Sequence, residues 1–175
     1  MNRINCNVGE NILGQSYPED AINLYKSSGD PTDPIQIVGN KIKGGGPSKS
    51  GSGIAVGDSA GAYVLVKDNV LVDPGQVGIG IGGGHHIQAL NNLIYARQQP
   101  FTNVGLFVWN WDNYNPNCYS HTVQGNTVNW THKAGFKNPN WDGRNCGPIA
   151  GWNNNTWSSN IGSSIEYLTI PSCSQ

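Results

Sequence analysis

Four residues with acid–base chemistry stand directly beside a recurring strand pattern. Lys26 and Asp58 each follow an alternating apolar segment, and His85 and His86 follow the next such segment after three glycines. An elimination reaction needs a base that takes a proton beside a carboxylate and a positive group that stabilises the developing charge. Lys26 or one histidine would be the base, and Asp58 would orient it or help to bind a divalent cation such as calcium. An ordinary surface pair between Lys26 and Asp58, with solvated histidines, is the common alternative.

The outward positions of the same segments outline a shallow groove. Small residues occupy its two middle layers, and Tyr25 and Trp109 form aromatic walls. Aromatic faces stack on sugar rings and amides bond sugar hydroxyls, so the groove predicts polysaccharide binding. Close packing by a loop would also explain the glycines. The two outward rows are Asn23, Ala55, Gly80 and Phe107, and then Tyr25, Gly57, Gly82 and Trp109.

Other catalytic and metal chemistries find less support. Adjacent histidines on a strand point to opposite faces, so His85 and His86 are not expected to ligate one ion. His121 fills an inward position and is expected to be structural. Hydrolysis of a glycoside needs two carboxylates facing a cleft, and Asp58 has no such partner in its column, although a loop could supply one. We therefore expect no metal site and no cofactor, apart from the cation at Asp58.

These residues are positioned by an imperfect repeat. Five asparagines share one local pattern, with an apolar residue three positions before and another two positions after each of them. Stacked on equivalent turns, the amides would form a ladder in which each bonds the one above and below. An asparagine that merely tolerates the turn backbone is the alternative. The five are Asn11, Asn40, Asn69, Asn92 and Asn126.

A second column of strands accompanies the asparagines. The segments AINLY, GIAVG, GIGIG and GLFVW begin at Ala21, Gly53, Gly78 and Gly105, and a degenerate copy, PIAGW, begins at Pro148. Their period of two residues predicts strands with inward Ile, Leu and Val. Two or three strands per repeat imply stacked coils and parallel sheets. No helix of crossover length separates the strands, which excludes a doubly wound fold and a TIM barrel.

The repeats resemble those of right-handed parallel β-helix proteins of the pectin-lyase-like superfamily. The resemblance spans roughly residues 6–157 and rests on the Asn-x-apolar repeats and the G-I-x-V strands. It implies an all-β, right-handed parallel β-helix of about five coils with long loops on one flank. Many members are polysaccharide lyases, hydrolases or epimerases, but their catalytic motifs are absent here. A lyase acting on an acidic polysaccharide is the leading expectation, and a non-catalytic carbohydrate-binding or structural module is the alternative.

Composition limits the remaining possibilities. The 175 residues suit one domain, residues 1–175, and a balance of 10 basic and 11 acidic residues argues against a nucleic-acid partner. No apolar stretch is long enough to cross a membrane. The low charged fraction of 12% and the four cysteines favour a secreted or periplasmic protein over a cytosolic one, and two glycosylation sequons add little weight because such sequences often arise by chance.

The cysteines and the loop aromatics complete the expectations. The cysteines lack C-x-x-C spacing, which disfavours structural zinc. Cys118 and Cys146 lie in loops of the last repeats and are expected to form a disulfide. Cys6 and Cys173 would be far apart unless the tail folds back. Two long loops, 110–120 and 129–146, are expected to expose four aromatic residues that cap the solenoid flank or contact ligand. These are Trp111, Tyr114, Trp130 and Trp141.

Overall fold

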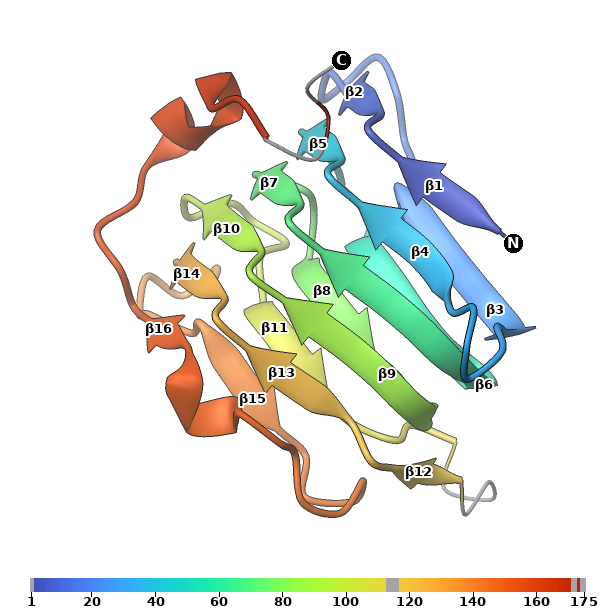
Figure 1. The fold of residues 1–175 in the computed structure, drawn as a ribbon. Coiled ribbons are helices and arrows are strands. Elements are labelled where there is room, and N and C mark those ends of the chain that lie inside the picture. Colours follow the sequence, from blue (N-terminus) through green and yellow to red (C-terminus); the bar gives the residue numbers. More distant parts are fainter. Residues whose placement is uncertain (1, 113–116, 171–172, 174–175) are drawn as a thin grey trace.

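The computed structural model describes residues 2–112, 117–170 and 173. These residues form an all-β structure of stacked parallel strands, compatible with a parallel β-helix or solenoid (Figure 1). The described part contains no α-helix, only the two short 3₁₀ helices η1 (Trp152–Asn154) and η2 (Ser163–Tyr167). Tyr114, one of the aromatic residues expected in the loops, lies outside the described residues.

The strands stack in three columns, and one passage of the chain through the columns is termed a coil below. The long strand β6 belongs to the first two columns and joins them into one sheet. The first column contains β3 (Ile22–Ser28), the start of β6 (Ser52–Lys67), β8 (Val77–Ile81), β11 (Val104–Val108) and β15 (Asn140–Asp142). The second contains β1 (Arg3–Asn5), β4 (Ile35–Val38), the end of β6, β9 (Gly84–Leu90), β12 (Cys118–Tyr119) and β13 (Thr122–Gln124). The third contains β2 (Val8–Glu10), β5 (Lys41–Lys43), β7 (Val70–Val72), β10 (Leu93–Ala96), β14 (Thr127–Trp130) and β16 (Thr156–Trp157).

The register of the first column confirms the alternating segments. Ile22, Ile54, Ile79 and Leu106 pair in succession, and the last three are fully buried. The next pairing residue is Asn140 of β15, so the expected copy at Pro148 is wrong. The alternation could not identify β15, because a polar residue takes the position equivalent to Leu106 in the last coil.

The asparagine ladder is confirmed at Asn40, Asn69, Asn92 and Asn126, which are all fully buried. Each Nδ2 donates to the Oδ1 of the asparagine on the next coil at 2.8–2.9 Å. Each also donates to a carbonyl three residues before the equivalent asparagine of the preceding coil, as Asn69 does to Ile37 at 2.8 Å. The ladder therefore satisfies backbone and side-chain groups together where the chain turns between columns.

The ends of the ladder differ from the sequence expectation. Asn7, not Asn11, occupies the first position, where its Nδ2 donates to Asn40 Oδ1 at 2.9 Å. Asn11 lies four residues later and donates to the Gly44 carbonyl instead. Asn155 extends the ladder beyond Asn126 at 2.8 Å. Gly9 stands where the pattern requires an apolar residue after Asn7, which hid the true first member.

The core lies between the columns and contains the inward Ile, Leu and Val side chains. Trp130 belongs to this core and is fully buried, so its expected exposure is wrong. It is the last residue of β14 and pairs with Ala96, whose small side chain leaves room for the indole. The expected loop 129–146 also contains β15.

The C-terminal segment after β16 folds back along the third column towards the first coil (Figure 1). Ile165 and Ile170 pack against Val70 and Val72 on the outer face of this column. Glu166 forms an ion pair with Lys43 at 2.9 Å.

A disulfide between Cys6 and Cys173 closes this segment onto the first coil, and the predicted disulfide between Cys118 and Cys146 is confirmed. Two disulfides indicate an oxidising compartment. The described residues include no helix of the length and hydrophobicity needed to cross a membrane.

Candidate functional site

The structure divides the four expected acid–base residues into two groups. Asp58 lies opposite Tyr25 in the register of β3 and β6, and the ammonium group of Lys26 lies over the Tyr25 ring, 5.1 Å from its centre. Among the described residues, no ion pair joins Lys26 to Asp58. His85 lies opposite Ala62, past the bend that separates the first column from the second. The bend within β6 thus separates His85 and His86 from Lys26 and Asp58, which lie on the first column.

The histidines belong to a cluster of four rings contributed by three coils. Tyr63 stacks on His86 with ring centres 5.0 Å apart, and Tyr119 stacks on His85 at 4.9 Å. Tyr63 lies on β6, the histidines on β9 and Tyr119 on β12. Neither tyrosine was expected from the sequence, because their proximity depends on the bends between columns.

The histidine side chains do not point to opposite faces. The Nδ1 atoms of His85 and His86 are 2.8 Å apart. His86 adopts a left-handed backbone with φ of 53°, which breaks the alternation of the strand and turns its ring towards His85. The expectation of opposed side chains is therefore wrong at this position.

The floor of the expected groove is covered by aromatic rings. A side chain at Gly80 would meet the Phe107 ring at 2.8 Å, and one at Gly82 would meet the Trp111 ring at 2.7 Å. Gly57 is also buried, and a side chain there would clash with the Gly83 carbonyl. Gly80 and Gly82 therefore provide room for rings, whereas Gly57 provides room for the backbone at Gly83.

These rings form an aromatic platform on the outer face of the first column. The platform consists of Phe107, Trp109, Trp111 and Trp141, with neighbouring ring centres 5.2–6.4 Å apart. Phe107 is buried beneath the others, whereas Trp111 is 37% and Trp141 is 44% exposed. Exposed indole faces of this size are well suited to contact a ligand.

A pocket of about 290 Å³ adjoins the platform and is lined on one side by Trp111. Asn23 Nδ2 donates to Asp20 Oδ2 at 2.8 Å and to Asp58 Oδ2 at 3.2 Å. Glu19 contributes a third carboxylate, which accepts a hydrogen bond from the Ser50 hydroxyl. The loop before β3 thus supplies the carboxylate partners that Asp58 lacks in its own column. The pocket is lined by Glu19, Asp20, Asn23, Ser50, Ala55, Asp58 and Trp111.

Asp20 is a pocket carboxylate whose pKa is shifted by its surroundings. Burial raises the pKa of Asp20 above its usual value, and the neighbouring charges of Glu19 and Asp58 act in the same direction. Hydrogen bonds from Asn23 and from the Ser52 amide oppose that increase. The raised pKa means that Asp20 takes up a proton more readily than an ordinary aspartate.

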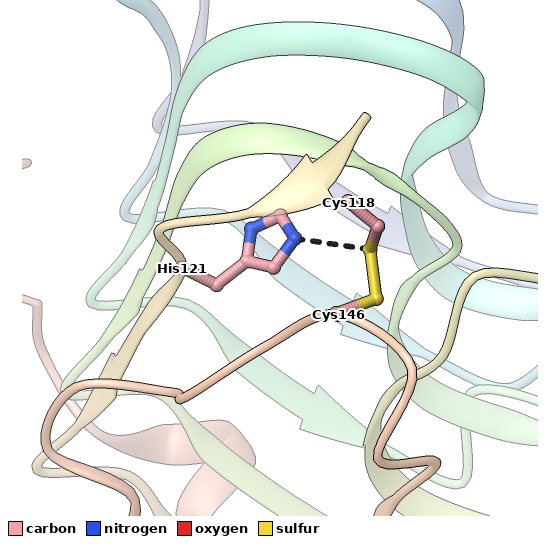
Figure 2. Close-up of side chains that lie close together, drawn as sticks. All are labelled: Cys118, His121 and Cys146. Atoms are coloured by element: carbon pink, nitrogen blue, oxygen red, sulfur yellow. Dashed lines mark hydrogen bonds between the residues drawn. A yellow bond between two sulfur atoms is a disulfide. The ribbon is translucent and has the colours of Figure 1, made fainter. Parts of the chain in front are cut away.

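A third constellation lies inside the fold. Cys118, His121 and Cys146 bring their sulfur and ring nitrogen atoms within 4.8 Å of one another, and His121 Nε2 is 3.4 Å from Cys118 Sγ (Figure 2). Because the sulfurs are bonded to each other they are not thiolates, the form that binds metals. The expected structural role of His121 agrees with its burial, which lowers its pKa to about 4 with help from the charges of His85 and His86.

The sequence revealed only part of the pocket and the platform. Asn23, Phe107 and Trp109 were identified from the strand period, because they lie on regular strands or directly after one, and Asp58 from its position beside the alternating segments. Glu19, Asp20 and Ser50 lie in loops outside that period. The only sequence signal for them was the general need of Asp58 for a second carboxylate.

Comparisons with protein-family models, with curated proteins and with solved structures find no match for this chain. A fold by itself does not define an activity. The functional conclusion therefore depends on the chemistry of the platform and the pocket.

Proposed function

We propose that this protein binds a polysaccharide along the first column, with the aromatic platform and the acidic pocket holding successive sugar units. The scaffold would be a right-handed parallel β-helix of about five coils, related to the pectin-lyase-like superfamily. Secretion or a periplasmic location would agree with the two disulfides and with an extracellular glycan as ligand.

The platform supports this proposal through its shape and exposure. Trp111 and Trp141 expose indole faces on neighbouring coils, and Trp109 contacts both of them. Parallel strands repeat at ~4.8 Å, so a row of rings across coils presents several stacking positions to an extended ligand. Burying such a ring against a sugar contributes about 1.5–3 kcal/mol, and more where the geometry is favourable.

The pocket supports the proposal through its hydrogen-bonding capacity. Ionised carboxylates only accept hydrogen bonds, and sugar hydroxyls are donors that match them. Three carboxylates in one pocket would repel a uronate, so this site favours an uncharged or amino-bearing sugar over the acidic polysaccharide expected from the sequence. Trp111 lines the pocket and also belongs to the platform, and this shared residue is the observation on which the proposal depends.

Glycoside hydrolysis is a second candidate. Asp20 and Asp58 share the Asn23 amide as donor, so they lie close together, and the raised pKa of Asp20 suits a general acid beside a second carboxylate. Retaining glycosidases place two carboxyl groups ~5–5.5 Å apart. The elimination reaction that involves Lys26, Asp58, His85 and His86 stays a prediction, and it would need the two groups to act on one substrate across the bend.

A glycan array followed by calorimetry tests the binding proposal. Trp111→Ala should weaken binding of the best neutral glycan at least ~10-fold, because it removes one stacking face. Phe136→Ala is the matched control, since Phe136 is an exposed ring that stacks on His132 away from the platform. Equal binding by wild type and Trp111→Ala would refute the proposal.

A product assay separates binding from catalysis. Reducing ends released from a bound neutral glycan, and lost in both Asp20→Asn and Asp58→Asn, would support hydrolysis. Unsaturated products from uronate polymers, seen as increasing ultraviolet absorbance, would support elimination. Binding without any product would leave the protein as a binding module.

A further inference from the structure

The paired histidines form a second candidate site, separated from the acidic pocket by the bend in β6. Their Nδ1 atoms, 2.8 Å apart, face each other at the protein surface, where His86 is exposed and His85 partly so. Tyr63 and Tyr119 hold the two rings from either side, with each tyrosine stacked on one histidine and edge-on to the other. The carbohydrate proposal uses neither nitrogen.

The distance between the nitrogens has a chemical meaning. Neutral imidazole nitrogen is a common ligand of late first-row metal ions, at ~2.0 Å from the metal. Two such ligands at right angles around one ion lie ~2.8 Å apart, which is the arrangement of square-planar or tetragonal Cu²⁺ and Ni²⁺. Tetrahedral Zn²⁺ would hold its ligands ~3.3 Å apart. In the metal-free protein the 2.8 Å contact is a hydrogen bond in which one Nδ1–H donates to the other Nδ1. A bound ion would take the place of that shared proton, and the spacing that the hydrogen bond sets is closer to that of a square-planar ion than to that of a tetrahedral one.

The backbone explains why adjacent residues can converge in this way. His86 and Tyr63 are both left-handed, with φ of 53°, a conformation that costs a non-glycine residue of this size ~1 kcal/mol or more. In an ordinary strand, side chains of consecutive residues diverge and could not share an ion. The two left-handed residues place both imidazoles and the Tyr63 ring on one side of the bend.

We propose that His85 and His86 bind one Cu²⁺ ion through their Nδ1 atoms, with Tyr63 and Tyr119 fixing the rings and solvent completing the coordination. In the bound state both imidazoles carry their proton on Nε2, so the histidine whose Nδ1–H donates in the metal-free protein changes tautomer on binding. Cu²⁺ also stands at the top of the affinity order for nitrogen sites. The buried Cys118–His121–Cys146 group is no competitor, because its sulfurs form a disulfide.

Titration with CuCl₂ in a non-coordinating buffer, followed by calorimetry and electron paramagnetic resonance, tests this site. We expect one Cu²⁺ per chain and a tetragonal spectrum with coupling to two nitrogens. His85→Ala and His86→Gly should each weaken Cu²⁺ binding by at least ~100-fold, which is more than the loss of a residue that only orients a ligand costs. Glycine accepts the left-handed backbone at position 86, so this variant removes the ligand without straining the fold.

His132→Ala is the matched control, because His132 stacks on Phe136 in a different loop. This variant should bind Cu²⁺ as the wild type does. The proposal is overturned if the wild type binds no Cu²⁺, if binding survives in both His85→Ala and His86→Gly, or if His132→Ala loses it equally. Tighter binding of Zn²⁺ than of Cu²⁺ would overturn the square-planar assignment. Circular dichroism of each variant separates loss of a ligand from loss of the fold.

Discussion

The asparagine ladder and the aromatic platform follow the same coils but differ in almost every physical respect. Equivalent ladder positions carry the same residue on consecutive coils, are fully buried from Asn40 to Asn126 and make the same hydrogen bonds. Equivalent positions on the platform face change from Asn23 to Ala55, Gly80, Phe107 and Trp141 along the stack. The repetition inside stabilises the coil, and the variation outside creates a local surface.

This contrast assigns stability to the interior and recognition to the outer face. A ladder residue should affect unfolding but not ligand affinity, whereas a platform residue should do the reverse. The following changes test that division, beginning with the largest expected effect.

Asn92→Ala removes a central ladder amide and should lower the free energy of unfolding by about 3–5 kcal/mol. It leaves the Nδ2 of Asn69 without its acceptor at 2.9 Å and the Val66 carbonyl without its donor at 3.0 Å, both buried. Each buried polar group left unsatisfied costs ~1–3 kcal/mol. Chemical denaturation measures the difference.

Asn7→Ala is the matched control at the open end of the same ladder. Asn7 is exposed, and among the described residues its side chain donates only to Asn40 Oδ1 and to the Asn5 carbonyl, so its loss should cost about 1 kcal/mol or less. Equal costs at Asn7 and Asn92 would contradict the assignment of stability to the buried part of the ladder.

The double variant Cys6→Ser and Cys173→Ser should lower the free energy of unfolding by about 2–4 kcal/mol, because it releases a loop closure of 167 residues. Released from the first coil, the segment 158–170 should become sensitive to proteolysis, since its remaining contacts are few: a small cluster around Ile165 and Ile170, the Glu166–Lys43 ion pair and single hydrogen bonds such as Asn129 Nδ2 to the Ile161 carbonyl. Limited proteolysis followed by mass spectrometry detects the cut. The matched variant Cys118→Ser with Cys146→Ser should leave the segment 158–170 protected. Cleavage of this segment in both double variants would contradict the specific role of the Cys6–Cys173 disulfide in holding it.

His121 should make stability depend on pH. Its pKa is about 4 in the folded protein and 6.5 when unfolded, so the unfolded state binds more protons between these values. Stability is therefore complete above pH 6.5 and is lost as pH falls towards 4, by about 3 kcal/mol in total. Urea denaturation at a series of pH values measures the slope, and His121→Gln should flatten it. An unchanged slope in that variant would assign the effect to other groups.

The sequence predicted the regularly repeated strand and ladder positions but not the positions that depend on bends and loops. Ile54, Ile79 and Leu106 were correctly placed by their period of two, and Asn40, Asn69 and Asn92 by their shared neighbours. The convergence of His85 and His86 depends on one left-handed residue, which a non-glycine sequence does not reveal. The tail was also hidden, because Cys6 and Cys173 approach only through irregular segments with no periodic signal. Asp20 was not predicted for the same reason, because it reaches the pocket from a loop with no periodic signal.

Trp141→Ala should change stability little, and it is the sharpest test of the division between a stabilising interior and a ligand-binding outer face. Trp141 is 44% exposed and lies on β15, the last strand of the first column, so its loss opens little of the core and should cost about 1 kcal/mol or less. It contacts Phe107 and Trp109, and it provides the platform face farthest along the stack from the acidic pocket. A long glycan that reaches this coil should therefore bind several-fold more weakly to Trp141→Ala, whereas a short one held at Trp111 should not. Calorimetry with oligosaccharides of increasing length measures both affinities. An equal loss of affinity for short and long ligands would show that Trp141 acts through Trp109 and Trp111 rather than by direct contact. A large fall in the free energy of unfolding would show instead that the platform belongs to the core.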